Sequence, residues 1–310
     1  MDTSEKVEAL VSTQWLVEEL RKRSTAEGET PSSPSSTTPS RLCILDATWL
    51  GLMDEGRKAY LAAHISGSHH FDLNQCRDKT SGLEFTLPSP EEFGRYVGGE
   101  LGIDNDTHVV VYENDPVFRV LSAPRTWWMF RLFGHDKVSV LDGGLKQWQA
   151  DGQPVESGDG SAVEPKLFSA KPARRDILKS FDQVLDNQKT GEFTMIDSRK
   201  KEWFDGSMAS IWPGLKLGHI RQTTNVPYDG FIREDNDRLV PPEDMRRLFQ
   251  SQGVDLSRPI ASSCFVGIGA CTVVLAAYVL GKEDVAVYDG SWDEFSRRAP
   301  EDSVVIVPDP

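Results

Sequence analysis

The sequence predicts an α/β protein made of two tandem copies of one domain, each with a mainly parallel β-sheet flanked by helices on both faces. Three observations lead to this prediction. The chain has 310 residues, enough for two cores of about 100–150 residues each. Short apolar runs rich in β-branched residues alternate with helical patterns, as in sheets buried on both faces. Finally, three segments recur in the same order in the two halves.

The internal repeat is the most informative of these features. Paired aspartates and histidines in the two halves are separated by 151, 155 and 147 residues, and so constant a separation favours duplication over chance. The matching segments are 42–46 and 193–197, His64-Ile65 and His219-Ile220, and 138–144 and 285–291.

The other predicted elements follow the same scheme. Each half has a buried strand followed by an apolar helix, at 109–112 and 123–133 in the first and at 260–263 and 270–280 in the second. We expect a first helix over 7–22 and a flexible Ser/Thr/Pro-rich surface insertion over 24–41. The predicted boundaries are 1–150 for the first domain, 151–175 for a linker and 176–310 for the second domain.

Composition and charge argue against some classes of binding partner. The formal net charge is −14, which argues against nucleic acid or an anionic membrane because both require basic patches. No apolar run approaches the roughly 20 residues that span a bilayer. The acidic start, 1–6, resembles neither a secretory signal nor a mitochondrial presequence. We therefore expect a cytoplasmic protein, with mitochondrial import left open.

The four cysteines do not have the spacing of a metal site, so we expect free thiols, no bound metal and no cofactor. Cys43 lies in a predicted buried strand and Cys271 one turn into an apolar helix, which indicates core positions for both. Cys76 lies in a polar loop and is expected to be exposed and oxidisable. Only Cys264 has surroundings that suggest chemistry.

Cys264 begins a short loop between the strand and the helix of the second domain, where ligands of such sheets bind. The loop continues with Phe265, Val266, Gly267, Ile268 and Gly269. Two glycines let the backbone turn tightly and point successive N–H groups at one place. These donors and the positive end of the helix favour a thiolate, and they would equally stabilise a persulfide. The alternative is a core cysteine in a turn whose glycines serve packing.

Four segments resemble the tandem-domain rhodanese family, the thiosulfate and 3-mercaptopyruvate sulfurtransferases. They are 64–67 (HISG), 122–131 (SAPRTWWMFR), 141–145 (LDGGL) and 288–292 (YDGSW). The likeness covers nearly the whole chain outside 24–41, and 122–131 is its most specific part. The resemblance implies two rhodanese-like domains, of which the first is non-catalytic and the second carries the active-site Cys264.

The resemblance also implies a reaction. In this family the loop cysteine takes a sulfane sulfur from a small sulfur-containing anion, thiosulfate or 3-mercaptopyruvate, and passes it from a persulfide to a thiol or cyanide. It implies that Arg199 lines the substrate entrance together with loop residues 265–269. The alternative for Arg199 is a surface arginine paired with a neighbouring carboxylate. Glu113 ends the corresponding strand of the first domain, where a carboxylate would repel anions.

The loop itself departs from the family pattern. Family members carry Arg-Lys or Gly-Ser/Thr after the cysteine, followed by Gly-Val-Thr. Here Phe265 and Val266 replace the specificity pair, and Gly269 replaces the threonine. Thiosulfate thereby loses its cationic partner, and mercaptopyruvate loses its hydroxyl.

Supporting positions outside the loop depart as well. Asn74 and Phe85 stand where mercaptopyruvate enzymes have an Asp and a His, and the second family arginine falls at Trp203 or Asp205. Charge-assisted contacts contribute about 1.5–3 kcal/mol each, so losing two weakens anion binding by about two orders of magnitude. The sequence thus predicts a sulfurtransferase with Cys264 as sulfur carrier and an altered or reduced activity.

Two other classes compete with this prediction. The missing substrate contacts would also fit a catalytically weakened rhodanese-like binding or scaffold protein. A cysteine phosphatase of the same fold is disfavoured, because its loop must close with an arginine that binds phosphate and here Gly269 or Ala270 stands in that place.

Overall fold

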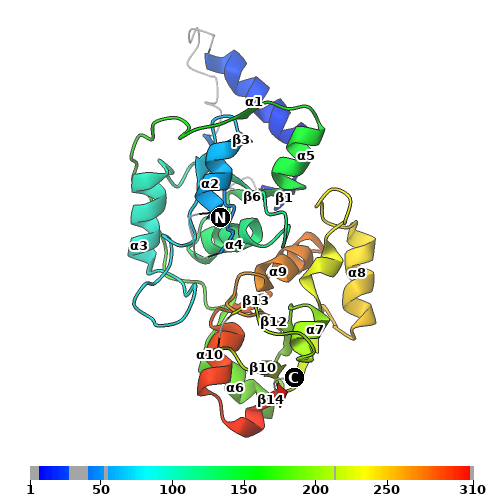
Figure 1. Cartoon of the computed structure of the whole chain (residues 1–310). Coiled ribbons are helices and arrows are strands. Elements are labelled where there is room, and N and C mark those ends of the chain that lie inside the picture. The colour runs from blue at the N-terminus through cyan, green and yellow to red at the C-terminus, as the bar shows by residue number, and fades with distance from the viewer. Residues whose placement is uncertain (1–6, 28–40, 52–54, 213, 308–310) are drawn as a thin grey trace.

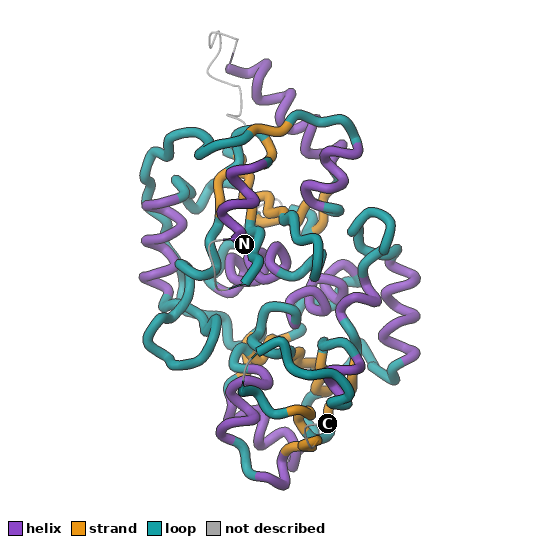
Figure 2. Tube along the Cα trace, in the orientation of Figure 1, coloured by secondary structure: helices purple, strands orange, loops and turns teal. Residues whose placement is uncertain are grey.

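The computed structural model describes residues 7–27, 41–51, 55–212 and 214–307, with side chains from 24 to 27 left out. It consists of two α/β halves stacked end to end (Figure 1). Each half contains a five-stranded, fully parallel sheet. The strands lie in the interior of each half with helices around them (Figure 2), which confirms the predicted fold class.

The two sheets have the same strand order, as expected of a duplication. In the first half it is β1 (Leu10–Val11), β6 (Val138–Leu141), β5 (His108–Tyr112), β2 (Leu42–Asp46) and β4 (His69–His70). In the second half it is β8 (Leu178–Lys179), β13 (Ala286–Tyr288), β12 (Ile260–Ser263), β9 (Thr194–Asp197) and β11 (Thr223–Asn225).

The repeated histidines also lie in equivalent places. In each half they belong to a short strand that forms an antiparallel pair outside the main sheet. The pairs are β3 (His64–Ile65) with β7 (Val155–Glu156), and β10 (Leu217–Ile220) with β14 (Val304–Val307).

Helices connect the parallel strands, as right-handed crossovers in such sheets require. The first half contains α1 (Thr13–Glu27), α2 (Glu55–Ala62), α3 (Pro90–Arg95), a π-helical turn (Tyr96–Glu100), α4 (Ser122–Leu132) and α5 (Gly144–Ala150). The second contains α6 (Phe181–Thr190), α7 (Lys201–Phe204), α8 (Pro242–Ser251), α9 (Ala270–Val279), α10 (Ser291–Arg298) and 3-10 turns at Tyr228–Phe231 and Glu301–Ser303. Within the described ranges, no helix is both long and apolar enough to cross a bilayer.

The N-terminal prediction was wrong in its boundaries. Residues 10–11 form β1 beside β6, because their apolar side chains complete the edge of the first sheet. The helix begins only at Thr13 and continues to Glu27, so residues 24–27 are helical although the flexible insertion was predicted to start at 24. The rest of the predicted insertion, 28–40, lies outside the described residues.

The segment predicted as a linker runs along the first half before it enters the second. Its β7 pairs with β3, the amide of Lys166 donates to the carbonyl of Gly98 at 2.8 Å, and Phe168 packs edge-on against Phe93. The segment is therefore held in place by the first domain.

The two halves meet through α4 and α9, which lie side by side at the centre of the molecule (Figure 1). Every residue of α4 is buried, and α9 is buried from Ala270 to Ala277. Trp127 of α4 packs edge-on against Tyr278 of α9, with ring centroids 5.2 Å apart. One continuous apolar core extends across both halves, so the loop before α9 lies directly against the first domain.

Candidate active site

Cys264 directly follows β12, the central strand of the second sheet, and opens the loop that leads into α9. The start of α10 fixes this loop from one side. The amides of Trp292 and Asp293 donate to the carbonyls of Cys264 (3.1 Å) and Phe265 (2.9 Å). The amide of Cys264 donates to Oγ of Ser291 at 3.1 Å. The backbone that carries the thiol is therefore anchored before the loop turns.

The turn itself leaves backbone donors unused. Within the described part of the chain, the amides of residues 265–269 donate no hydrogen bond to the protein. Gly269 is the N-cap of α9, and a Cβ added there would lie 3.9 Å from Sγ of Cys264. The sulfur therefore lies beside the first turn of an apolar helix, where the partial positive charge of the helix end is concentrated.

Gly267 holds the loop in its conformation. Its φ is +80°, a region that residues with a side chain rarely adopt. A Cβ at this position would meet the carbonyl oxygen of Asp289 at 2.6 Å. Gly267 therefore serves the close packing of the loop and does not line the pocket.

An arginine from the first domain supports the same turn. Arg125 of α4 forms an ion pair with Asp289 at 2.7 Å and donates to the carbonyls of Gly267 (3.4 Å) and Phe85 (3.0 Å). Its side chain is only 2% exposed. The loop is thus fixed from both halves of the molecule.

A small pocket of about 50 Å³ adjoins Cys264, which is itself 6% exposed. Its wall is almost entirely apolar and combines both domains. The first domain contributes Trp49, Phe118 and Leu121, and the second contributes Trp203, Ile211, Trp212, Tyr228, Phe265, Val266 and Ile268 together with Arg199 and Gly269. The aromatic rings contact one another: Trp203 lies edge-on to Phe265 with centroids 5.2 Å apart.

Arg199 lines this pocket, but its charge is already paired. Its guanidinium binds both carboxylate oxygens of Asp197, at 2.6–3.0 Å, and the carbonyl of Gly218 at 2.8 Å. It also lies over the rings of Phe265 and Trp292. The alternative interpretation, a surface arginine, is wrong about location, since the residue is 2% exposed. It is right that Arg199 pairs with a neighbouring carboxylate, that of Asp197.

The positions that depart from the family pattern have separate places. Trp203 lines the pocket, whereas Asp205 is exposed and accepts hydrogen bonds from Ser207. Asn74 accepts a hydrogen bond from Nε1 of Trp49 at 3.3 Å, and Phe85 lies edge-on to the same indole. Asn74 and Phe85 therefore support the aromatic wall from behind and do not reach the pocket.

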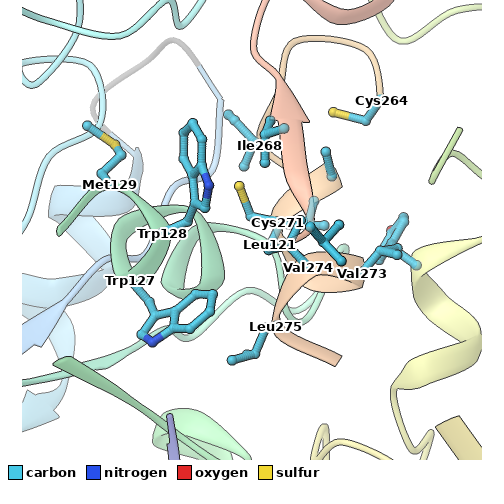
Figure 3. Close-up of a cluster of buried hydrophobic side chains, with 14 of the residues drawn as sticks. Leu121, Trp127, Trp128, Met129, Cys264, Ile268, Cys271, Val273, Val274 and Leu275 are labelled. Carbon is cyan, nitrogen blue, oxygen red and sulfur yellow. The ribbon is translucent and has the colours of Figure 1, made fainter. Parts of the chain in front are cut away.

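The other cysteines are distinguished from Cys264 by their surroundings. Cys271 is fully buried between α4 and α9, as predicted for a core residue (Figure 3), and burial raises the pKa of its thiol to about 12. Burial likewise raises the pKa of the Cys43 thiol to about 12 in the half-buried start of β2. The prediction of an exposed Cys76 was wrong: it is 3% exposed, because Phe85 and Tyr96 bury the polar loop's inner side together with it.

In the first domain a carboxylate takes the place of the thiol. Glu113 follows β5 and accepts hydrogen bonds from the amides of Leu121, Ser122 and Ala123 at 3.0–3.1 Å, and from the Ser122 hydroxyl at 2.7 Å. The amides at the start of α4 are therefore already occupied by an internal carboxyl group. Burial raises the pKa of Glu113 to about 7.

Sequence reasoning missed several residues of the site. Trp49, Leu121 and Trp212 line the pocket, and Ser291 and Arg125 hold the loop. Arg125 and Ser291 belong to the motifs 122–131 and 288–292, so their importance was detectable. Their roles were not, because each depends on contacts between segments far apart in the chain.

Comparisons with known proteins agree with this arrangement. The rhodanese-like domain model matches residues 39–151 and 180–298. The chain is 45% identical over 299 residues to a thiosulfate sulfurtransferase of Rattus norvegicus, covering 96% of this chain and 95% of that protein. It is 40% identical over 301 residues to the 3-mercaptopyruvate sulfurtransferase of Homo sapiens, with coverage of 96% and 95%.

A solved structure of similar architecture leads to the same family. It is the crystal structure of SseA from Escherichia coli, described as a 3-mercaptopyruvate sulfotransferase of rhodanese fold. The identity is 31%, the TM-score is 0.74, and the match covers 92% of this chain and 99% of that one. With two matched domains, two equivalent sheets and the loop cysteine in the second, the chain belongs to the rhodanese family as a tandem-domain member.

Proposed function

We propose that this protein is a sulfurtransferase in which Cys264 carries the transferred sulfur as a persulfide. The observation that supports this most strongly is the position of its sulfur, beside the N-cap of α9 in a loop whose amides at 265–269 have no other acceptor among the described residues. Such donors stabilise a thiolate, and they stabilise a terminal persulfide anion that extends one sulfur further.

In this proposal the two domains have different roles. The first domain ends near residue 150 and the second begins near residue 176. The second domain performs the chemistry, and the reacting sulfur is surrounded by Arg199, Phe265, Val266, Ile268 and Gly269, while Gly267 sets the turn of the loop. The first domain is non-catalytic in this proposal, because Glu113 stands in the place of the thiol and already accepts hydrogen bonds from the equivalent amides. Its role is to complete the pocket wall with Trp49 and Leu121 and to hold the loop through Arg125.

Turnover by the full chain tests the proposal. Candidate sulfur donors are thiosulfate, 3-mercaptopyruvate and an alkyl hydropersulfide, and a thiol or cyanide is the acceptor. We expect turnover with at least one donor that is abolished in Cys264→Ser and retained in Cys43→Ser, whose thiol lies in the other domain. Turnover that survives Cys264→Ser would refute the proposal, and the absence of turnover with every donor would favour a binding or scaffold protein. The cytoplasmic location stays a prediction, testable by imaging the full chain.

A further inference from the structure

We propose that the donor for Cys264 is a small hydropersulfide with a short apolar carbon chain, R–S–SH, and that the pocket discriminates against thiosulfate. This inference rests on the proposed sulfurtransferase function and specifies its substrate class. Three properties of the pocket lead to it: its apolar wall, its paired charge and its small volume.

The wall next to the thiol offers little to a charged substrate. Trp203, Phe265 and Val266 line it with aromatic and aliphatic surface, and the one polar atom they add is Nε1 of Trp203, a neutral donor without a partner among the described residues. Trp212 closes the wall toward the first domain by stacking near Trp49, with centroids 6.2 Å apart. An alkyl group gains from burial against such a surface, whereas a sulfonate group loses its hydration there.

The cation in the pocket does not offset that loss. Arg199 is held bidentately by Asp197, and both side chains are 2% exposed. The pair has no net charge, so a dianion that approached it would also approach the buried carboxylate of Asp197. The Tyr228 hydroxyl adds a neutral group, because burial raises its pKa further above the ordinary value. The polar groups that remain are neutral donors, namely Nε1 of Trp203 and the amides of residues 265–269, and the amides suit one negative charge on the transferred sulfur.

Volume sets the size of the donor. The pocket is small, at about 50 Å³, compared with the roughly 10–15 Å³ that a single water molecule needs on the same measure. The transferred sulfur and the first carbons of a linear chain fit this space. A branched carbon next to the sulfur brings more atoms against the surrounding rings than a linear chain does, so we expect such a donor to react more slowly.

The chemistry balances without another reactant. The Cys264 thiolate attacks the outer sulfur of R–S–SH, a new S–S bond forms, and the donor's S–S bond breaks with its electron pair leaving on R–S⁻. The proton on the transferred sulfur then passes through solvent to R–S⁻, which gives Cys264–S–S⁻ and R–SH. The sulfane sulfur moves without net oxidation or reduction, and its charge ends at the loop amides.

The test measures how fast each donor adds one sulfur to Cys264 in the full chain, by quenched-flow mass spectrometry with Cys264→Ser as the background. The donors are ethyl hydropersulfide, tert-butyl hydropersulfide and thiosulfate. We expect the loading rate constant for the ethyl compound to exceed that for thiosulfate by about 10-fold or more, because the sulfonate group loses hydration against the apolar wall, and to exceed that for the branched compound. A thiosulfate rate equal to or above the ethyl rate would overturn the inference. If no donor loads Cys264, the proposed function itself fails.

A matched pair of variants tests the wall directly. Trp203→Arg places a cation in the pocket, and Leu167→Arg places one on the surface, where the leucine is 86% exposed. Trp203→Arg should raise the ratio of thiosulfate to ethyl hydropersulfide loading by about 10-fold, the effect of one regained charge-assisted contact. Leu167→Arg should leave the ratio unchanged. Equal ratios in the two variants, both folded by circular dichroism, would contradict the inference. If Trp203→Arg does not fold, Phe265→Arg replaces it in the same comparison. The ratio of thiosulfate to ethyl hydropersulfide loading in the unmodified protein tests the inference independently of both variants.

Discussion

Arg125 in the first domain and Asp289 in the second form a buried ion pair of 2.7 Å directly beneath the Cys264 loop. The same guanidinium donates to the carbonyl of Gly267, and the second oxygen of Asp289 accepts the amide of Leu87 at 3.0 Å. Two domains therefore meet at the turn that shapes the active-site loop. Through this contact the first domain holds the loop that carries Cys264 in the second domain.

Arg125→Lys tests this role as a positioning residue. Lysine keeps the charge but cannot reach the carboxylate and both carbonyls at once. We expect kcat to fall about 10- to 100-fold with little change in KM, because small displacements of a reacting group are costly. The free energy of unfolding should fall by about 1.5–3 kcal/mol. Steady-state kinetics and chemical denaturation measure both quantities.

Arg131→Lys is the matched control for that variant. Arg131 is also buried in α4, but it lies over Trp127 and Tyr278 and makes no contact with the loop. Its replacement should lower stability and leave kcat nearly unchanged. Equal losses of kcat in the two variants would show that Arg125 acts only through stability.

Gly267→Ala should disrupt the loop more than an ordinary glycine substitution does. Gly253, after α8, has a similar φ of +71° but open space around its Cα, so Gly253→Ala experiences the backbone strain alone. Gly267→Ala adds a contact of 2.6 Å with the Asp289 carbonyl. Such overpacking lowers the free energy of unfolding by about a further 1–3 kcal/mol. We expect sulfur transfer to be lost only in Gly267→Ala. Similar stability and activity of the two variants would contradict the described packing.

His108 should make the protein less stable in mild acid. Burial lowers the pKa of this side chain to about 4. Its Nε2 donates a hydrogen bond to Oγ of Ser139, because the Ser139 hydroxyl donates its own proton to the carbonyl of Glu8. The unfolded chain binds a proton below about pH 6.5 while the folded chain does not, so stability falls as the pH decreases from 6.5 toward 4 and then levels off.

The size of that effect follows from the shift in pKa. Between pH 7.5 and 4 it amounts to about 3 kcal/mol, and it should be absent in His108→Gln, which retains a donor for Ser139. Denaturation curves of both proteins across this pH range measure the difference. Parallel pH profiles would show that His108 does not contribute.

The sequence predicted more of the fold than of the candidate site. Asp46 and Asp197 end equivalent strands, because the same pattern of apolar residues occurs in both halves of the sequence. The Cys264 loop could be recognised from its two glycines. Local pattern failed where tertiary packing decides. It could not show that Trp49 approaches Cys264 from the other domain, that Cys76 is buried, or that Arg199 is held by Asp197 in the interior.

The most direct test of the account is to find where the transferred sulfur resides. The full chain is treated with donor, digested and analysed by mass spectrometry before and after addition of cyanide. The account predicts a gain of one sulfur atom on the peptide containing Cys264 alone, removed by cyanide with release of thiocyanate. A sulfur found on Cys43, Cys76 or Cys271, with Cys264 unmodified, would contradict the account.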